Sequence, residues 1–116
     1  MKFINSPTSY RSILLILVGL ILPSPAQSML DEGIFKMYNY ELEAAVAILD
    51  SAYYLDNEHP VTPFVRVATN WMLVQTTIGY EESYDVLYNE VDKTIPIYQS
   101  LIDDYPGNAE YVLYLG

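Results

Sequence analysis

The chain contains no cysteine and only one histidine, His59, among its 116 residues. The lack of cysteine excludes disulfides and thiolate nucleophiles, so the fold must be stabilised by packing alone. A single histidine, with no serine and aspartate in a recognisable order around it, gives little basis for nucleophilic catalysis. We expect His59, which precedes Pro60, to be a turn residue, with a lone general base as the alternative. We therefore predict no catalytic residue, no cofactor and no enzyme activity.

Recognisable metal-binding sequences are absent as well. Paired carboxylates can perform acid–base chemistry or bind calcium, but no spacing of acidic residues here matches an EF-hand loop. Acidic side chains are also favoured in the first turn of a helix by the helix dipole alone. We predict such a solvent-exposed role, and no metal site, for the three acidic clusters: Glu41/Glu43, Glu81/Glu82/Asp85 and Glu90/Asp92.

Basic residues are scarce, with five lysines and arginines against fifteen aspartates and glutamates. Two of the five, Lys2 and Arg11, precede an unbroken apolar run at residues 13–22, and small residues follow up to Ala26. This order is typical of a secretory signal peptide. The ten residues of the run fall short of the ~20 that cross a bilayer. We predict a signal peptide at residues 1–26.

Cleavage after Ala26 or after Ser28 fits this signal, and the lack of a following cysteine excludes a lipid-anchored lipoprotein. Because Lys2 and Arg11 leave with the signal, residues 27–116 keep three basic residues against all fifteen acids, a formal charge of −12. Such a surface repels phosphate groups, which disfavours nucleic acids and anionic lipids. We predict an exported protein, periplasmic or extracellular, that fits a bacterial envelope and meets the membrane only through its transient signal.

The spacing of apolar residues predicts helices throughout residues 27–116. Apolar side chains recur at steps of three and four, and no stretch alternates with period two. Helix starts are expected at Ser28, which opens a sequence like a capping box, at Asn39 and at Thr62. Gly79 is expected to end the third helix. The buried face predicted for that helix comprises Phe64, Val67, Ala68, Trp71, Gln75 and Ile78.

The fourth helix is expected to be the longest, and Pro96 inside it should kink the helix or split it near Thr94. Its predicted buried face comprises Tyr84, Leu87, Tyr88, Val91, Ile95, Tyr98, Leu101, Ile102 and Tyr105. Asn108 should cap a last helix, which ends about two turns later at Gly116. We therefore expect the helical domain at residues 27–116 to be incomplete at its C-terminus, with self-association through this last helix as a further possibility.

Two segments share a pattern of small and large residues. Ala45, Leu49 and Ala52 stand at steps of four and three, and Tyr98 and Leu101 repeat the last of these steps before Pro106. This pattern resembles the tetratricopeptide repeat, in which small residues flank a large apolar one and a proline closes each helical hairpin. Leu49 and Tyr98 stand 49 residues apart, against a family period of about 34 residues, so the second unit is longer.

The resemblance implies an all-α fold of antiparallel helical hairpins, stacked as a short tetratricopeptide-like solenoid. Small residues would let neighbouring helices approach closely while large ones fill the space between layers. The positions expected to pack the repeats are Gly33, Ala45, Leu49, Ala52, Trp71, Tyr98, Leu101, Pro106 and Gly116.

The same resemblance implies a scaffold that binds another protein or a peptide. Eleven of the twelve tyrosines lie in residues 27–116, and tyrosine is enriched at interfaces. The tyrosines that fit an apolar stripe least well are a candidate partner surface, with packing against further helices as the alternative: Tyr40, Tyr54, Tyr80, Tyr111 and Tyr114. Two other functions stay open, a non-catalytic N-terminal region of a longer exported enzyme or transport-associated protein, and an oligomerisation module.

Overall fold

The computed structural model describes residues 24–116, and within them the fold is all-α, as predicted. The predicted signal peptide lies outside the described residues except for its last three, 24–26. The described helices are α2 (Pro25–Tyr38), α3 (Leu42–Leu55), α4 (Thr62–Gln75), α5 (Tyr80–Asp104) and α6 (Ala109–Leu115).

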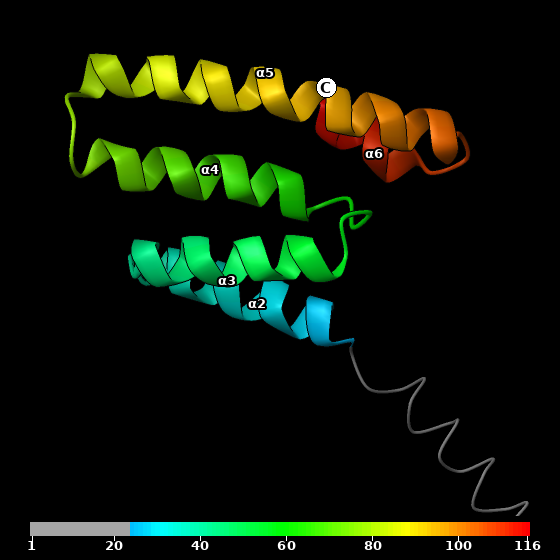
Figure 1. The fold of residues 1–116 in the computed structure, drawn as a ribbon, viewed down its shortest axis with the longest axis horizontal. Coiled ribbons are helices and arrows are strands. Elements are labelled where there is room, and N and C mark those ends of the chain that lie inside the picture. Colours follow the sequence, from blue (N-terminus) through cyan, green and yellow to red (C-terminus); the bar gives the residue numbers. More distant parts are fainter. Residues whose placement is uncertain (1–23) are drawn as a thin grey trace, which may run out of the picture.

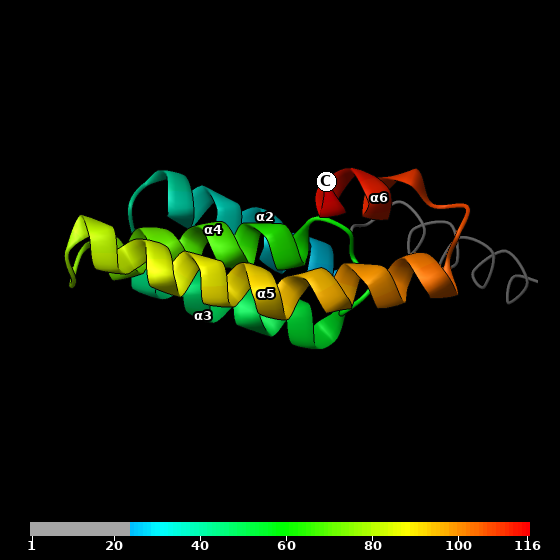
Figure 2. The same ribbon diagram turned by 90° about the horizontal axis from the view of Figure 1, so that it is seen from above.

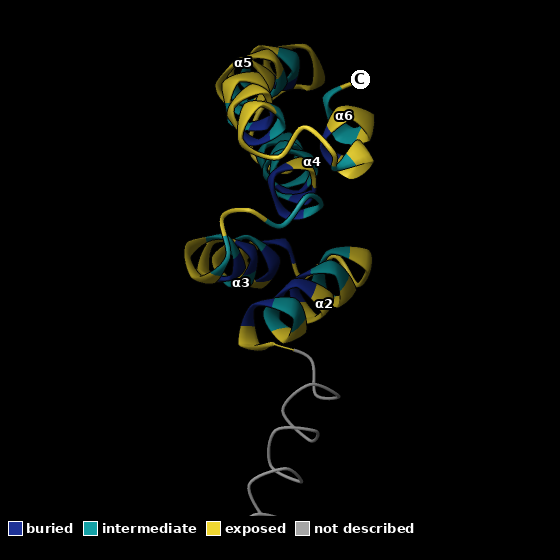
Figure 3. Ribbon diagram, turned by 90° about the vertical axis from the view of Figure 1, so that its right-hand side faces the viewer, coloured by how far each residue is buried: buried dark blue, intermediate teal, exposed yellow. Residues whose placement is uncertain are grey.

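Consecutive helices run antiparallel and pack against one another, so the chain forms a stack of helical hairpins (Figure 1). Viewed along the long axis of the molecule, α2 and α6 lie on one side of the stack and α3 and α5 on the other, with α4 between them (Figure 3). Helix α4 is therefore the central element, because it contacts α3 and α5 and also reaches α2. This arrangement is compatible with a short helical-repeat solenoid.

Helix α2 begins earlier than the sequence predicts. Ser24 is its N-cap and accepts a hydrogen bond from the Gln27 amide at 3.1 Å, and Pro25 occupies the first helical position. Ser28, the expected cap, lies inside the helix, where its amide donates to the Ser24 carbonyl at 3.0 Å. The capping box at Ser28 is therefore wrong, because Ser24 followed by proline supplies a start one turn earlier.

The turn between α2 and α3 also differs from its prediction. Asn39 caps the C-terminus of α2, and its side-chain amide donates to the Phe35 carbonyl at 2.9 Å. The chain then turns through Tyr40, whose φ of 59° is the one positive φ of a non-glycine residue in the described range. Glu41 is the N-cap of α3 and pairs with Lys36 at 3.1 Å. Asn39 thus ends one helix instead of starting the next.

The first core forms where α2, α3 and α4 meet. Leu30, Leu49, Ala52 and Val65 are buried together, and Ala45 is buried as well, so the three α3 residues expected to pack the repeats, Ala45, Leu49 and Ala52, are all buried. Gly33 on α2 lies directly against Leu49, since a Cβ built on Gly33 would come within 2.6 Å of the Leu49 Cδ2 atom. The small residue is therefore required for the close approach of these two helices.

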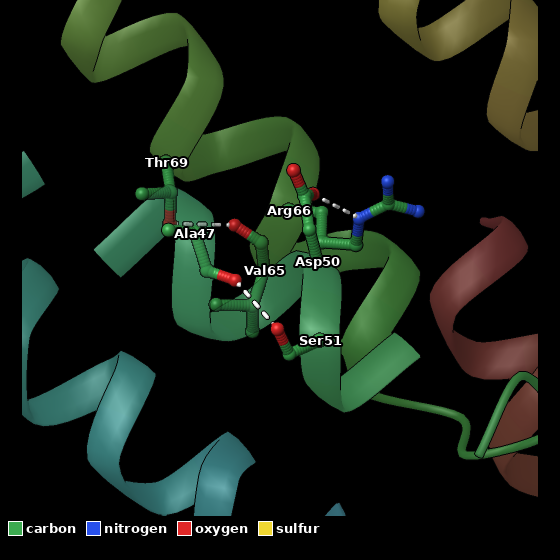
Figure 4. A network of polar contacts seen from close by, with 6 residues as sticks. All are labelled: Ala47, Asp50, Ser51, Val65, Arg66 and Thr69. Atoms are coloured by element: carbon green, nitrogen blue, oxygen red, sulfur yellow. Dashed lines mark hydrogen bonds and ion pairs between the residues drawn. The ribbon is translucent and has the colours of Figure 1, made fainter. Parts of the chain in front are cut away.

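The buried face of α4 is not the predicted one. Thr62, Val65 and Thr69 are buried, whereas Phe64 is 52% exposed and Ile78 lies beyond the end of the helix. The prediction followed the largest apolar residues, but the core here accepts a threonine because the Thr69 hydroxyl donates to the Val65 carbonyl at 2.8 Å (Figure 4).

Arg66 of α4 contacts two residues of α3, Asp50 and Tyr53. Its Nε donates to the Asp50 carboxylate at 3.0 Å (Figure 4). Its guanidinium lies 4.4 Å from the centre of the Tyr53 ring. Cation–π contacts of this kind and exposed ion pairs are individually weak. Arg66 therefore adds to an apolar contact that the first core already makes.

Helix α5 is continuous through Pro96, so the predicted split near Thr94 does not occur. Gly79 is the N-cap of α5 instead of the end of α4. A second core forms at the far end of α5, where Tyr98 and Leu101 are buried together with Tyr111 of α6. Two separate cores, one at each end of the stack, are thus joined through α4.

Candidate functional site: an uncovered groove between α4 and α5

One apolar stripe of α5 is covered only at its C-terminal end. Helix α6 has 7 residues against the 25 of α5, and it packs on Tyr98, Leu101 and Ile102. Asn108 caps α6 as predicted, accepting from the Glu110 amide at 3.0 Å. Figures 1 and 2 show α6 beside this end of α5 alone, with its last residue short of the middle of the longer helix.

The same stripe continues uncovered toward the start of α5. Helical spacing places Tyr84, Tyr88, Val91 and Ile95 on the face that carries Tyr98 and Ile102. Tyr88 is 63% exposed, and Val91 and Ile95 are each 36% exposed. We call these four residues, Tyr84, Tyr88, Val91 and Ile95, the α5 stripe. The sequence assigns all four to the core, whereas in the described structure Tyr88, Val91 and Ile95 are exposed and Tyr84 is half-buried.

A cavity of about 110 Å³ opens at the tip of α6, between α4 and α5. Its lining is apolar except for a threonine and two tyrosines: Val67, Val91, Thr94, Ile95, Tyr98, Tyr114 and Leu115. Tyr114 seals the end next to α6, with its ring 5.5 Å from that of Phe64 and 6.4 Å from that of Tyr98. The cavity therefore lies where the end of α6 meets α4 and α5.

Aromatic side chains continue the apolar surface from this cavity toward the start of α5. The Trp71 and Tyr84 ring centres are 5.5 Å apart, and Tyr80 packs edge-on to Tyr84 at 5.1 Å. Tyr88 follows Tyr84 at 6.3 Å. We call the α5 stripe together with Val67 and Trp71 of α4 the α4–α5 groove.

Polar contacts fix the aromatic end of the groove. The Trp71 indole donates to the Ser83 hydroxyl at 3.3 Å, and that hydroxyl donates to the Tyr80 carbonyl at 2.6 Å. The Tyr80 and Tyr84 hydroxyls lie 2.6 Å apart, and this hydrogen bond raises the pKa of Tyr84. These hydrogen bonds thus fix the positions of the Trp71, Tyr80 and Tyr84 side chains relative to one another.

Acidic side chains follow one flank of the groove. Glu81, Asp85 and Asp92 are exposed, and their spacing of four and seven residues places them in one row beside the α5 stripe. Lys93, the lysine of α5, lies on a different flank, where its ammonium is 3.7 Å from the Glu90 carboxylate. We call Glu81, Asp85 and Asp92 the acidic row.

The five tyrosines predicted as a partner surface do not form one surface. Tyr40, Tyr54 and Tyr80 are exposed, at 79%, 88% and 65%, but they belong to the α2–α3 turn, to α3 and to α5. Tyr111 is 4% exposed, and its place in a partner surface is wrong because its hydroxyl donates to the Glu58 carbonyl. Tyr114 is half-buried in the second core.

Most of the residues predicted to pack repeats are in a core. Ala45, Leu49, Ala52, Tyr98 and Leu101 are buried, and Trp71 is half-buried. Two other positions, Pro106 and Gly116, are exposed in the described structure, and a Cβ on Gly116 would meet nothing closer than 3.8 Å.

Three tyrosines of α5, α6 and the turn between them tie the α3–α4 loop to the second core. The Tyr98 hydroxyl donates to the Pro60 carbonyl at 2.6 Å and accepts from the Phe64 amide at 3.2 Å. Burial raises the pKa of Tyr98 to about 12. The Tyr105 hydroxyl donates to the Glu58 carboxylate at 2.7 Å, and this bond raises the Tyr105 pKa.

His59 lies in the same α3–α4 loop. One ring nitrogen is 2.9 Å from the Gln27 side-chain oxygen, and the other accepts from the Val61 amide at 3.2 Å. Both ring nitrogens thus have protein partners, as expected for a turn residue. Among residues 24–116, no three histidine, cysteine or acidic side chains are grouped so that they could hold a metal ion. None of the helices described is long and apolar enough to span a membrane.

Comparison of the chain with models of protein families, with curated proteins and with solved structures finds no match.

Proposed function

We propose that the protein is an exported, tetratricopeptide-like scaffold that binds a segment of another protein in the α4–α5 groove. The proposal rests on one observation above all. The apolar stripe that α6 covers at one end continues toward the start of α5, where Tyr88, Val91 and Ile95 are exposed and the Tyr84 ring packs against Trp71. Contiguous exposed apolar surfaces with a polar rim are typical of protein-binding sites.

Two features support the tetratricopeptide-like part of the proposal. Gly33 lies in close contact with Leu49, as a small helix-crossing residue would, and Tyr98 fills the second core. The family resemblance and the signal-like residues 1–26 supply the rest, namely a scaffold role and export. A second copy of the chain, bound through α6, is an alternative partner, because Val112 and Leu113 on that helix are 54% and 70% exposed.

Selection from a displayed library of helical and extended peptides tests the proposal without assuming a ligand. The protein is the bait, and each enriched peptide is re-tested on the double variant Val91→Ser/Ile95→Ser. Both residues are partly exposed, so the variant is expected to keep the fold, which circular dichroism checks.

A matched control separates the groove from apolar surface in general. Phe35 and Tyr38 on α2 are 65% and 74% exposed, so Phe35→Ser/Tyr38→Ser removes more exposed apolar area than the groove variant, on a helix that does not line the groove. We expect binders that lose at least about tenfold in affinity on the groove variant and keep it on the control. Enrichment of only those peptides that bind both variants equally would contradict the proposal.

A further inference from the structure

We propose that a second site, between α4 and α5 on the side that faces α3, binds a carboxylate group carried on a short apolar stem. The site goes beyond the proposed function and does not depend on the α4–α5 groove. Its basis is a cavity lined by two of the three basic side chains of residues 27–116, Arg66 and Lys93. We call it the Arg66–Lys93 cavity.

The lining residues come from two facing stripes of α4 and α5. These helices pack against each other and run antiparallel (Figure 1). Each contributes four residues at positions i, i+3, i+4 and i+7, which lie on one face of a helix. They are Pro63, Arg66, Val67 and Asn70 of α4, and Glu90, Lys93, Thr94 and Ile97 of α5. The spacing of these residues in the sequence therefore brings them to one place.

The cavity is small and partly apolar. Its volume is about 160 Å³. A cavity of about 150 Å³ can hold benzene, so the space suits an apolar group of about six carbon atoms or fewer. Pro63 is buried, and Val67 and Ile97 are half-buried. These three side chains would contact the apolar stem of a ligand.

The Arg66–Lys93 cavity opens away from α6. Arg66 contacts α3 through Asp50, and α3 and α6 lie on opposite sides of α4 (Figure 3). The cavity at the tip of α6 shares only Val67 and Thr94 with this one. All residues that line the Arg66–Lys93 cavity belong to α4 and α5, so its walls do not depend on α6.

Arg66 provides the paired donors that a carboxylate binds. Its Nε donates to Asp50 at 3.0 Å, and its two Nη nitrogens have no hydrogen bond within residues 24–116. Figure 4 shows both Nη nitrogens on the far side of the guanidinium from Asp50. The Tyr53 ring, 4.4 Å away, supports the guanidinium in this position. Two parallel N–H···O bonds from one guanidinium to a carboxylate are among the stronger hydrogen bonds in proteins.

Lys93 gives the lining a second positive charge. Its Nζ is 3.7 Å from the Glu90 carboxylate, which is longer than a hydrogen bond, and no hydrogen bond of Nζ is present within residues 24–116. Glu90 is the one acidic side chain of the lining, so two basic groups against one acidic group leave a net positive charge. The domain around it is strongly acidic and would repel a doubly charged anion more than a singly charged one. A monocarboxylate with an apolar stem therefore matches the cavity best.

The test compares two small molecules of the same shape, 3-methylbutanoate and its uncharged amide. Calorimetric titration of the intact chain measures the affinity for each. We expect the acid to bind at least about tenfold more tightly than the amide, because its hydrogen bonds with Arg66 are charge-assisted. Equal affinities, or no binding of the acid, would overturn the proposal.

Two lysine variants locate the effect. Lys93→Gln and Lys36→Gln each remove one positive charge, and Lys36 pairs with Glu41 at the α2–α3 turn, away from the cavity. Lys93 is 75% exposed, so its loss should weaken binding of the acid by about threefold or more while circular dichroism shows an unchanged fold. Binding to Lys36→Gln should stay as it was. Equal losses in both variants would mean that only net charge matters, and would contradict the site.

A third variant tests the guanidinium directly. Arg66→Lys keeps the charge but removes the planar pair of donors, and it should weaken the acid by about tenfold. The affinity for the amide should change less, which separates a loss of carboxylate recognition from a distorted cavity. An acid affinity that stays unchanged would show that Arg66 does not hold the carboxylate.

Competition identifies the source of the carboxylate. The competitors are two pentapeptides that end in leucine, one with a free C-terminal carboxylate and one with an amide. Displacement of 3-methylbutanoate by the first alone supports the site and assigns it to a peptide end, whereas displacement by neither supports it as a site for free acids. Displacement by both equally would contradict carboxylate recognition.

The groove variant separates this inference from the proposed function. Val91→Ser/Ile95→Ser changes no residue that lines the Arg66–Lys93 cavity, so it should bind 3-methylbutanoate as the unchanged protein does. A loss of acid binding on this variant would contradict the location of the site. Failure of the peptide selection on the groove would leave the carboxylate site standing, and the reverse also holds.

Discussion

At the scale of single residues, the hydroxyl groups of three tyrosines join parts of the chain that are far apart in the sequence. Tyr98, Tyr105 and Tyr111 all donate to groups of the α3–α4 loop, and so they hold a loop that separates the two cores. The Tyr98 hydroxyl is both donor and acceptor, so its loss would leave the Pro60 carbonyl and the Phe64 amide without this partner.

Replacement of Tyr98 by phenylalanine should therefore lower the free energy of unfolding by about 1–3 kcal/mol. The ring stays in the core and only the hydroxyl is lost, so the change reports on the two hydrogen bonds. Urea denaturation measures it, with Tyr54→Phe as the control because Tyr54 is 88% exposed. Equal midpoints for the two variants would show that the loop does not depend on Tyr98.

The same tyrosines predict a loss of stability in alkali. The pKa of Tyr98 is raised to about 12 by burial, and those of Tyr105 and Tyr111 are raised as well. A pKa that is higher in the folded state means that the protonated form is favoured there, so the stabilisation is complete below pH ~10 and is lost as the pH rises toward 12. Urea midpoints between pH 8 and 11.5 should fall over this upper range, and less steeply in Tyr98→Phe. A midpoint that stays constant to pH 11.5 would contradict the assignment.

At the scale of helices, close packing and backbone hydrogen bonds determine which residues a helix can accept at a given position. Gly33 allows α2 and α3 to approach, while Pro96 costs α5 one hydrogen bond without breaking it. The first feature is required by the fold, and the second is tolerated by it.

Gly33→Ala should destabilise the protein by about 1–3 kcal/mol, because the added methyl group would come within 2.6 Å of Leu49. Gly107→Ala is the matched control. A Cβ there meets nothing within 4 Å and the φ of Gly107 is not positive, so this change should stabilise by about 0.4–1 kcal/mol. Thermal unfolding of both variants gives the comparison, and the same sign for both would refute the close approach of α2 and α3.

Pro96→Ala should stabilise the protein by up to about 3 kcal/mol, because alanine restores a backbone donor inside a continuous helix. Pro106→Ala, in the exposed turn before α6, should instead be neutral or slightly destabilising, since proline there restricts the unfolded chain. Differential scanning calorimetry of the two variants distinguishes them. A lower melting temperature for Pro96→Ala would mean that the proline packs in a way that alanine cannot replace.

The comparison of sequence and structure also belongs to this scale. Apolar spacing correctly predicts four hairpin-forming helices and a short last one, and the buried face of α3. It fails for α4, where the buried Thr69 is invisible to a pattern of apolar residues, and at Ser28 and Asn39, where neighbouring caps compete. For α5 the spacing finds the stripe but not its exposure, because exposure depends on which other segments pack on this face and not on α5 itself.

At the scale of the whole molecule, the fold consists of two cores joined by α4, with a vacant groove between α4 and α5 and a strongly acidic surface. The groove lies at the tip of α6 and beside the acidic row, so a ligand bound there would meet both apolar and acidic side chains. Membership in a tetratricopeptide-like group and export stay predictions. The groove is the part of the account that a direct measurement can decide.

That measurement is a nuclear magnetic resonance titration of the protein with a helical peptide enriched from the displayed library, following the methyl signals of valine and isoleucine. We predict saturable changes at Val67, Val91 and Ile95, while Val46 and Ile48 on α3, away from the groove, keep their positions. Changes spread evenly over all methyl groups, or no saturable change at any of them, would contradict the claim that the α4–α5 groove is a docking site for a helix.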